Sequence, residues 1–111
     1  MLKIMQDLTV TLLQCELAWE NPAANLSFFE KSFEQSIQQT DLVVLPEMFT
    51  TGFSMNAREL AQDMDGTAVK WIRETSARHQ VDITGSMIIR DGQRYYNRLI
   101  WAKPDGTLQT Y

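Results

Sequence analysis

Hydrophobic patterning in the first 45 residues predicts a strand, a helix and a second strand. In residues 8–13, leucine and valine alternate with threonine, which is the period of a half-buried strand. Apolar side chains then recur every three or four positions over residues 26–37, behind an Asn21-Pro22 pair typical of a helix start. The run 41–45, Asp-Leu-Val-Val-Leu, lacks polar alternation and predicts a strand covered on both faces.

A loop over residues 49–66 separates these elements from a second helix, predicted over residues 67–79. We expect Thr67 to cap this helix, and Glu74 to form an i,i+4 ion pair with Arg78. Strand, helix and strand in this order favour a parallel crossover unit, so the fold class is expected to be α/β.

The rest of the chain predicts antiparallel strands joined by tight turns. Strands are predicted over residues 81–90 and 94–102, with Asp-Gly at 91–92 as the hairpin signal between them. A Pro-Asp-Gly turn at 104–106 leads into a last strand that starts at residue 108. The sequence stops inside this strand, so we expect the domain to be incomplete.

Composition and charge narrow the classes of function. The 111 residues are 44% hydrophobic, which argues for one folded domain, and the net charge of −4 gives no reason to expect nucleic acid as a partner. A single Cys excludes a disulfide framework and, with a single His, cannot build a structural zinc site; both suit a reducing, cytoplasmic compartment. The first ten residues lack a long apolar run, so neither a signal peptide nor a membrane anchor is expected.

Two residues that often carry chemistry are interpreted here as structural. His79 stands at the predicted end of a helix, where the helix dipole favours a cation, so a plain surface role is expected. Cys15 has no evident basic neighbour that would activate it and is interpreted as a small hydrophobic residue. Phosphate-binding glycine loops and the Gly-x-Ser-x-Gly elbow of serine hydrolases are absent from the sequence.

Glu47 is the candidate for catalysis. It follows an apolar strand and Pro46, and the carboxyl end of a parallel strand is where α/β folds place functional groups. A carboxylate held among Met48 and Phe49 would be partly desolvated, which makes it a better proton acceptor. The alternative is that Glu47 is simply the first solvated residue after a buried strand, and spacing alone slightly favours that interpretation.

The segment 45–53, Leu-Pro-Glu-Met-Phe-Thr-Thr-Gly-Phe, resembles the glutamate motif of the nitrilase superfamily, the carbon–nitrogen hydrolases. Other segments fall in the order of that family: Leu13-Gln14, the helix after Asn21, Gly85-Ser86, Tyr96-Asn97 and Pro104-Asp105-Gly106. The longer run through Ser54-Met55 looks most like the omega-amidases, which deamidate omega-amides of 2-oxo acids such as 2-oxoglutaramate.

The resemblance implies a Glu-Lys-Cys mechanism in which a Cys thiolate attacks the amide carbonyl, ammonia leaves, and water hydrolyses the thioester. Glu47 matches the general base of the family, and Met48 and Phe53 beside it could wall the pocket. The resemblance further implies a small-molecule amide substrate, a homodimer, and no metal or organic cofactor.

Family members are more than twice as long as this chain and fold as a four-layer α-β-β-α sandwich. Residues 1–111 are therefore expected to form the amino-terminal half of that sandwich, truncated before the catalytic Lys and Cys. Cys15 aligns to the first strand and Lys103 precedes the position of the family's Lys, so neither is carried over. Two hypotheses stand: the amino-terminal segment of an omega-amidase-like hydrolase with Glu47 as base, or a non-catalytic fragment or assembly module without a nucleophile.

Overall fold

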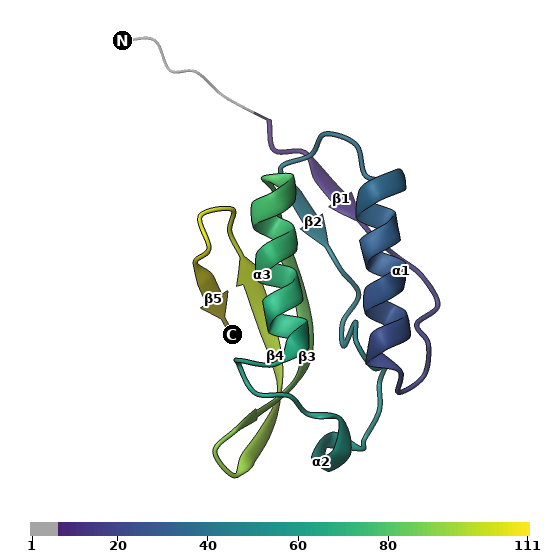
Figure 1. Ribbon diagram of the computed structural model, residues 1–111, viewed down its shortest axis with the longest axis vertical. Helices are drawn as coiled ribbons and strands as arrows, with labels where there is room; N and C mark the ends of the chain where they lie inside the picture. Colours follow the sequence, from purple (N-terminus) through teal and green to yellow (C-terminus); the bar gives the residue numbers. More distant parts are fainter. Residues whose placement is uncertain (1–6) are drawn as a thin grey trace.

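The computed structural model describes residues 7–111, which form a single five-stranded sheet and three helices (Figure 1). In chain order the elements are β1 (Val10–Leu12), α1 (Pro22–Gln35), β2 (Leu42–Val44), α2 (Ala57–Leu60), α3 (Thr67–His79), β3 (Asp82–Asp91), β4 (Arg94–Ala102) and β5 (Leu108–Thr110). The first six residues, part of the stretch considered above for a signal peptide or membrane anchor, lie outside the described residues.

The strand order in the sheet follows the chain, β1-β2-β3-β4-β5. The pairs β1–β2 and β2–β3 are parallel, and the pairs β3–β4 and β4–β5 are antiparallel. Helices α1 and α3 therefore belong to two successive crossovers, and the α/β class predicted from the sequence is confirmed. None of the helices formed by residues 7–111 combines the length and hydrophobicity needed to span a bilayer.

Helix α1 begins as the sequence predicts. The Asn21 side-chain oxygen accepts a hydrogen bond from Ala24 N at 3.1 Å, and Pro22 occupies the first helical turn, where its missing N–H costs nothing. Phe29 and Phe33 lie on the apolar stripe of this helix and are 0% and 4% exposed.

The start of α3 corrects the prediction for Thr67. Thr67 is the first helical residue, and Gly66 is the N-cap, without a side chain to accept a hydrogen bond. Gln62, in the preceding loop, supplies the acceptor instead, because its Oε1 takes a hydrogen bond from Ala68 N at 2.9 Å. The same loop, predicted to be irregular, contains the one-turn helix α2.

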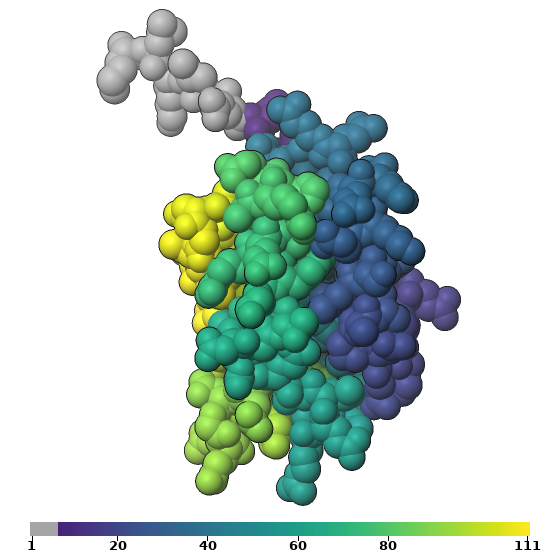
Figure 2. Space-filling view, viewed as in Figure 1, coloured from purple at the N-terminus to yellow at the C-terminus, as the bar shows by residue number. Residues whose placement is uncertain are grey.

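Glu30 of α1 forms hydrogen bonds with two residues of α3 and so joins the two helices. Arg78 donates to Glu30 Oε1 at 2.8 Å, and Trp71 Nε1 donates to Glu30 Oε2 at 2.7 Å. The expected Glu74–Arg78 pair does not form, because Arg78 reaches across to the neighbouring helix. Figure 2 shows atoms of α1 and α3 meeting along this seam.

The core lies between these two helices and one face of the sheet (Figure 1). It contains Phe29, Phe33, Val43, Leu45, Phe49, Ala68, Val69, Ile72, Val81, Ile83, Met87, Ile89, Ile100 and Ala102. Each large side chain buried there contributes about 1.5–3 kcal/mol to folding. This face of the sheet holds most of the apolar packing of the chain.

The opposite face of the sheet, here called the open face, is covered by neither α1 nor α3. Because side chains alternate along a strand, Val10, Leu12 and Leu99 point to this face, away from the core. Their exposed fractions are 44%, 71% and 36%. Val44 is only half-buried, so the two-sided cover predicted for its strand is not supplied by the described residues.

We expect the 111-residue chain, expressed by itself, to bind the dye ANS and to self-associate, because the open face exposes the apolar side chains of Val10, Leu12 and Leu99. Leu12→Glu should lower both ANS fluorescence and the sedimenting mass. Phe28→Glu is the matched control, since Phe28 is an exposed apolar residue on α1 and not on the open face. A monodisperse monomer with a sharp cooperative melt would contradict this expectation.

Candidate active site

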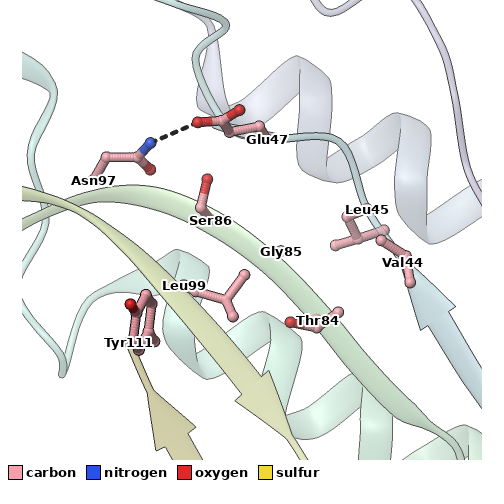
Figure 3. Close-up of a pocket in the computed structure, with 9 residues that line it drawn as sticks. All are labelled: Val44, Leu45, Glu47, Thr84, Gly85, Ser86, Asn97, Leu99 and Tyr111. Carbon is pink, nitrogen blue, oxygen red and sulfur yellow. Dashed lines mark hydrogen bonds between the residues drawn. The ribbon is translucent and has the colours of Figure 1, made fainter.

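Glu47 lies just beyond the carboxyl end of β2, as the sequence predicts (Figure 3). Leu45 N still donates to Thr84 O of β3 at 2.8 Å, but Pro46 has no N–H and ends the ladder. The chain then turns over residues 47–51, and Glu47 is the first residue of this turn. Sheet pairing thus fixes the point from which the carboxylate projects.

Asn97 of β4 is the hydrogen-bond partner of Glu47. Its Nδ2 donates to Glu47 Oε1 at 3.0 Å, across 50 positions of sequence. Figure 3 shows the two side chains pointing toward each other above β3. The structure therefore brings together a residue that the sequence marked as a candidate base and a residue marked only as part of a family segment.

The expected desolvation of Glu47 is not observed in this chain. Its side chain is exposed, whereas the two residues that follow, Met48 and Phe49, are 8% and 0% exposed. The apolar side chains anchor the turn in the protein and leave the carboxylate in water. The prediction failed because it assumed that sequence neighbours share one environment, and a turn sends their side chains to different sides.

Ser86 of β3 holds the backbone of this turn. Met48 N donates to Ser86 Oγ at 2.9 Å, and Phe49 N donates to Ser86 O at 3.0 Å. Met48 has a φ of 50°, a left-handed conformation that costs a residue with a side chain about 1–2 kcal/mol. The two hydrogen bonds to Ser86 offset this cost and set the direction in which Glu47 leaves the turn.

Gly85 allows the turn to approach β3 closely. A Cβ at this position would lie 2.8 Å from Phe49 Cδ1, which is too close, and 3.0 Å from Leu45 Cβ, which is a tight contact. Glycine is therefore required for Phe49 to pack on the strand. The Gly85-Ser86 pair, noted in the sequence only as a family segment, combines close packing with hydrogen bonding.

Asn25 of α1 ties the other side of the turn to the helix layer. It is 3% exposed, its Oδ1 accepts from Ala18 N at 2.8 Å, and its Nδ2 donates to Ala18 O and to Thr50 O at 2.9 and 2.7 Å. Asn25 is not among the residues that the sequence marked as candidates. The available signal was an amide on the buried stripe of α1, four positions before Phe29.

Two hollows meet at Glu47. One, of about 400 Å³, is bounded by Val44, Leu45, Glu47, Thr84, Gly85, Ser86, Asn97, Leu99 and Tyr111 (Figure 3). The other, of about 420 Å³, is bounded by Gln14, Cys15, Leu17, Trp19, Pro46, Glu47, Gly52 and Phe53. Both lie within the size range of small-molecule sites.

Phe53 and Met48, expected beside the base, are separated by the turn. Phe53 lines the second hollow next to Glu47. The side chain of Met48 instead borders a third hollow, which Phe53 shares but Glu47 does not.

Cys15 lies near Glu47, on the wall of the second hollow, but has the wrong electrostatics for a nucleophile. Partial burial raises the pKa of the Cys15 thiol above its ordinary value, so the reactive thiolate is disfavoured at neutral pH. This agrees with the interpretation of Cys15 as a packing residue.

His79 and Lys103 lie away from both hollows at Glu47. His79 is at the amino-terminal edge of β2 and β3, half-buried with its ring centroid 5.3 Å from that of Phe33, so it is a packing residue rather than a plain surface one. Lys103 belongs to the turn between β4 and β5. In the part of the chain that the structure describes, no three His, Cys, Asp or Glu side chains gather as ligands for a metal ion.

The chain is similar in sequence to proteins of a known family. The family profile described as carbon-nitrogen hydrolase matches residues 9–111. The chain is 44% identical over 107 residues to the omega-amidase YafV of Yersinia enterocolitica, covering 96% of this chain and 41% of that protein. It is 31% identical over 102 residues to the 2-oxoglutaramate amidase of Bacillus subtilis, covering 90% of this chain and 39% of that protein.

A solved structure shares the fold closely. The crystal structure of XC1258 from Xanthomonas campestris, a CN-hydrolase superfamily protein with an arsenic adduct in its active site, aligns with a TM-score of 0.91 and 47% identity. The alignment covers 96% of this chain and 40% of that one. The chain thus spans well under half the length of the relatives it matches.

Ser86→Ala should destabilise the protein by about 1–3 kcal/mol, because it leaves the buried Met48 N–H without its side-chain acceptor. The free energy of unfolding in urea would measure the effect. Ser32→Ala is the matched control: its hydroxyl donates to Phe28 O on the exposed side of α1, and its loss should change stability by less than about 0.5 kcal/mol. Equal effects of the two substitutions would remove Ser86 from its anchoring role.

Proposed function

Because the chain belongs to the carbon-nitrogen hydrolase family, we propose that it is part of an amide hydrolase in which Glu47 is the general base. The observation that carries the proposal is the Glu47 carboxylate, held by Asn97 where two small-molecule-sized hollows meet. Among residues 7–111, Oε1 accepts from Asn97 and Oε2 has no hydrogen-bond partner in the protein, so Oε2 is available to take a proton.

The proposed chemistry follows the Glu-Lys-Cys mechanism implied by the family resemblance. A Cys thiol gives its proton to the Glu47 carboxylate as sulfur bonds to the amide carbonyl carbon, and a Lys ammonium stabilises the resulting oxyanion. The C–N bond then breaks, Glu47 returns the proton to the departing nitrogen, and ammonia leaves a thioester. Water attacks the thioester, losing a proton to Glu47, and the thiol is restored with release of the acid. These steps require no metal ion or organic cofactor.

We propose that the nucleophilic Cys and the Lys are supplied by residues outside this chain segment. Cys15 has a raised thiol pKa, and Lys103 borders neither hollow at Glu47. The relatives are longer, with the chain covering 41% and 39% of two of them. In this proposal the described sheet is one half of an α-β-β-α sandwich, and a second sheet packs on the open face.

The proposed substrate is the omega-amide of a small 2-oxo acid, such as 2-oxoglutaramate, and the products are the 2-oxo dicarboxylic acid and ammonia. Support comes from the names of two relatives, an omega-amidase and a 2-oxoglutaramate amidase, at 44% and 31% identity. A homodimer in the cytoplasm belongs to the same proposal and rests on the family resemblance and on the low Cys content.

Glu47→Gln should lower turnover by about a hundredfold to ten-thousandfold in the protein as its source cell makes it, because the amide keeps the shape but cannot accept a proton. Ammonia release from 2-oxoglutaramate would measure it. Glu59→Gln is the matched control, since Glu59 also accepts a hydrogen bond from an Asn side chain but borders neither hollow at Glu47. Near-wild-type kcat in the Glu47 variant would exclude the base role.

The intact mass of the protein from its source cell distinguishes the enzyme from a non-catalytic fragment or assembly module. The proposal expects more than twice 12.8 kDa, the mass of this chain, with a Lys and then a Cys in the additional sequence. A mass of 12.8 kDa would leave the protein without a nucleophile for this mechanism. In that case a partner chain would be expected to cover the open face.

A further inference from the structure

We propose that Asn97 is the positioning residue for Glu47: its side-chain amide holds the carboxylate in the orientation that proton transfer requires. This inference rests on the proposed role of Glu47 as general base and adds the residue that fixes its geometry. The observation behind it is the 3.0 Å hydrogen bond from Asn97 Nδ2 to Glu47 Oε1 (Figure 3).

Glu47 needs such a partner because little else restrains its side chain. The backbone of the turn is fixed by Ser86, but the Glu47 side chain is exposed and has three rotatable bonds. Among the described residues, Asn97 makes the only hydrogen bond to the carboxylate. Without it, the carboxylate would sample several rotamers, and few of them would direct Oε2 at one reacting atom.

Asn97 is suited to this task because it is itself held on a rigid strand. It lies in the interior of β4 and pairs with Ile88 of β3, which is 5% exposed. Sites built on strands are positioned more accurately than sites built on loops. The β3–β4 hairpin thus supplies both restraints on the base, Ser86 for the backbone of the turn and Asn97 for the side chain.

The chemistry of the amide fits a positioning role. A carboxylate only accepts hydrogen bonds, so the –NH₂ of Asn97 must face it, and this group neither takes nor supplies the catalytic proton at neutral pH. The donated hydrogen bond occupies Oε1 and leaves Oε2 as the proton acceptor. Asn97 also borders the first hollow together with Glu47, so the hydrogen bond lies where a substrate would sit.

The test compares Asn97→Leu and Asn97→Asp in the protein as its source cell makes it, with 2-oxoglutaramate as substrate. Leu removes the donor at similar size, and Asp replaces it with a second negative charge facing Glu47. We expect kcat to fall about tenfold to a hundredfold in Asn97→Leu and at least as far in Asn97→Asp, with KM within about twofold of wild type. Thermal melts should change little, because Asn97 is exposed.

The matched control is Asn56→Leu. Asn56 also donates its side-chain amide to a glutamate, Glu59 Oε2, at 3.2 Å, but borders neither hollow at Glu47. Its kcat and KM should equal those of the wild type. A similar loss of kcat in this variant would show a general effect of removing such surface hydrogen bonds and would overturn the proposal.

The remaining outcomes separate this inference from the proposed function. An active wild-type enzyme whose Asn97 variants keep their kcat would overturn only the role of Asn97. A rise in KM at unchanged kcat would make Asn97 a substrate-binding residue instead of a positioning one. A wild-type protein that releases no ammonia, with the Lys and Cys present, would overturn the proposed function and the role of Asn97 with it.

Discussion

The position of Glu47 depends on how the turn after β2 is held against β3. Pro46 ends the ladder, Met48 takes a left-handed conformation, and the cost of that conformation is offset by two hydrogen bonds to Ser86. Phe49 also packs against α1, since its ring centroid lies 5.8 Å from that of Phe29 in an edge-to-face contact. Contacts with both the sheet and α1 therefore hold the turn from which the Glu47 carboxylate projects.

The two faces of the sheet have different roles: one packs the hydrophobic core, and the other carries residues of the candidate site. The helix face holds the apolar core, and Glu30 locks α1 to α3 above it through Trp71 and Arg78. The open face holds Ser86 and Asn97, together with the exposed Val10 and Leu12. Packing of the first face positions the polar groups of the second, so a change in the core can alter the site without touching it.

Local patterning predicted most of the fold but only part of the candidate site. Both long helices, the strands and the Asn21 cap follow from periodicity and end signals within one segment, and the bounds of α3 match the predicted 67–79. The ion pair predicted for Arg78 was wrong, because the actual partner of Arg78 is Glu30, which lies 48 positions away in the sequence. The contact of Asn97 with Glu47 was not predicted for the same reason, since only the register of β3 with β4 places Asn97 beside Glu47.

The exposure of Glu47 and the exposure of the apolar open face have one physical origin. Both lie on the side of the sheet that α1 and α3 leave uncovered. In the proposed sandwich, packing of a second sheet would end both exposures. It would bury Val10, Leu12 and Leu99, and it would close the hollow around the Glu47–Asn97 pair. Excluding water there strengthens every charge interaction at the reacting amide. The hydrophobic effect that completes the fold would therefore also create the environment in which Glu47 becomes an effective base.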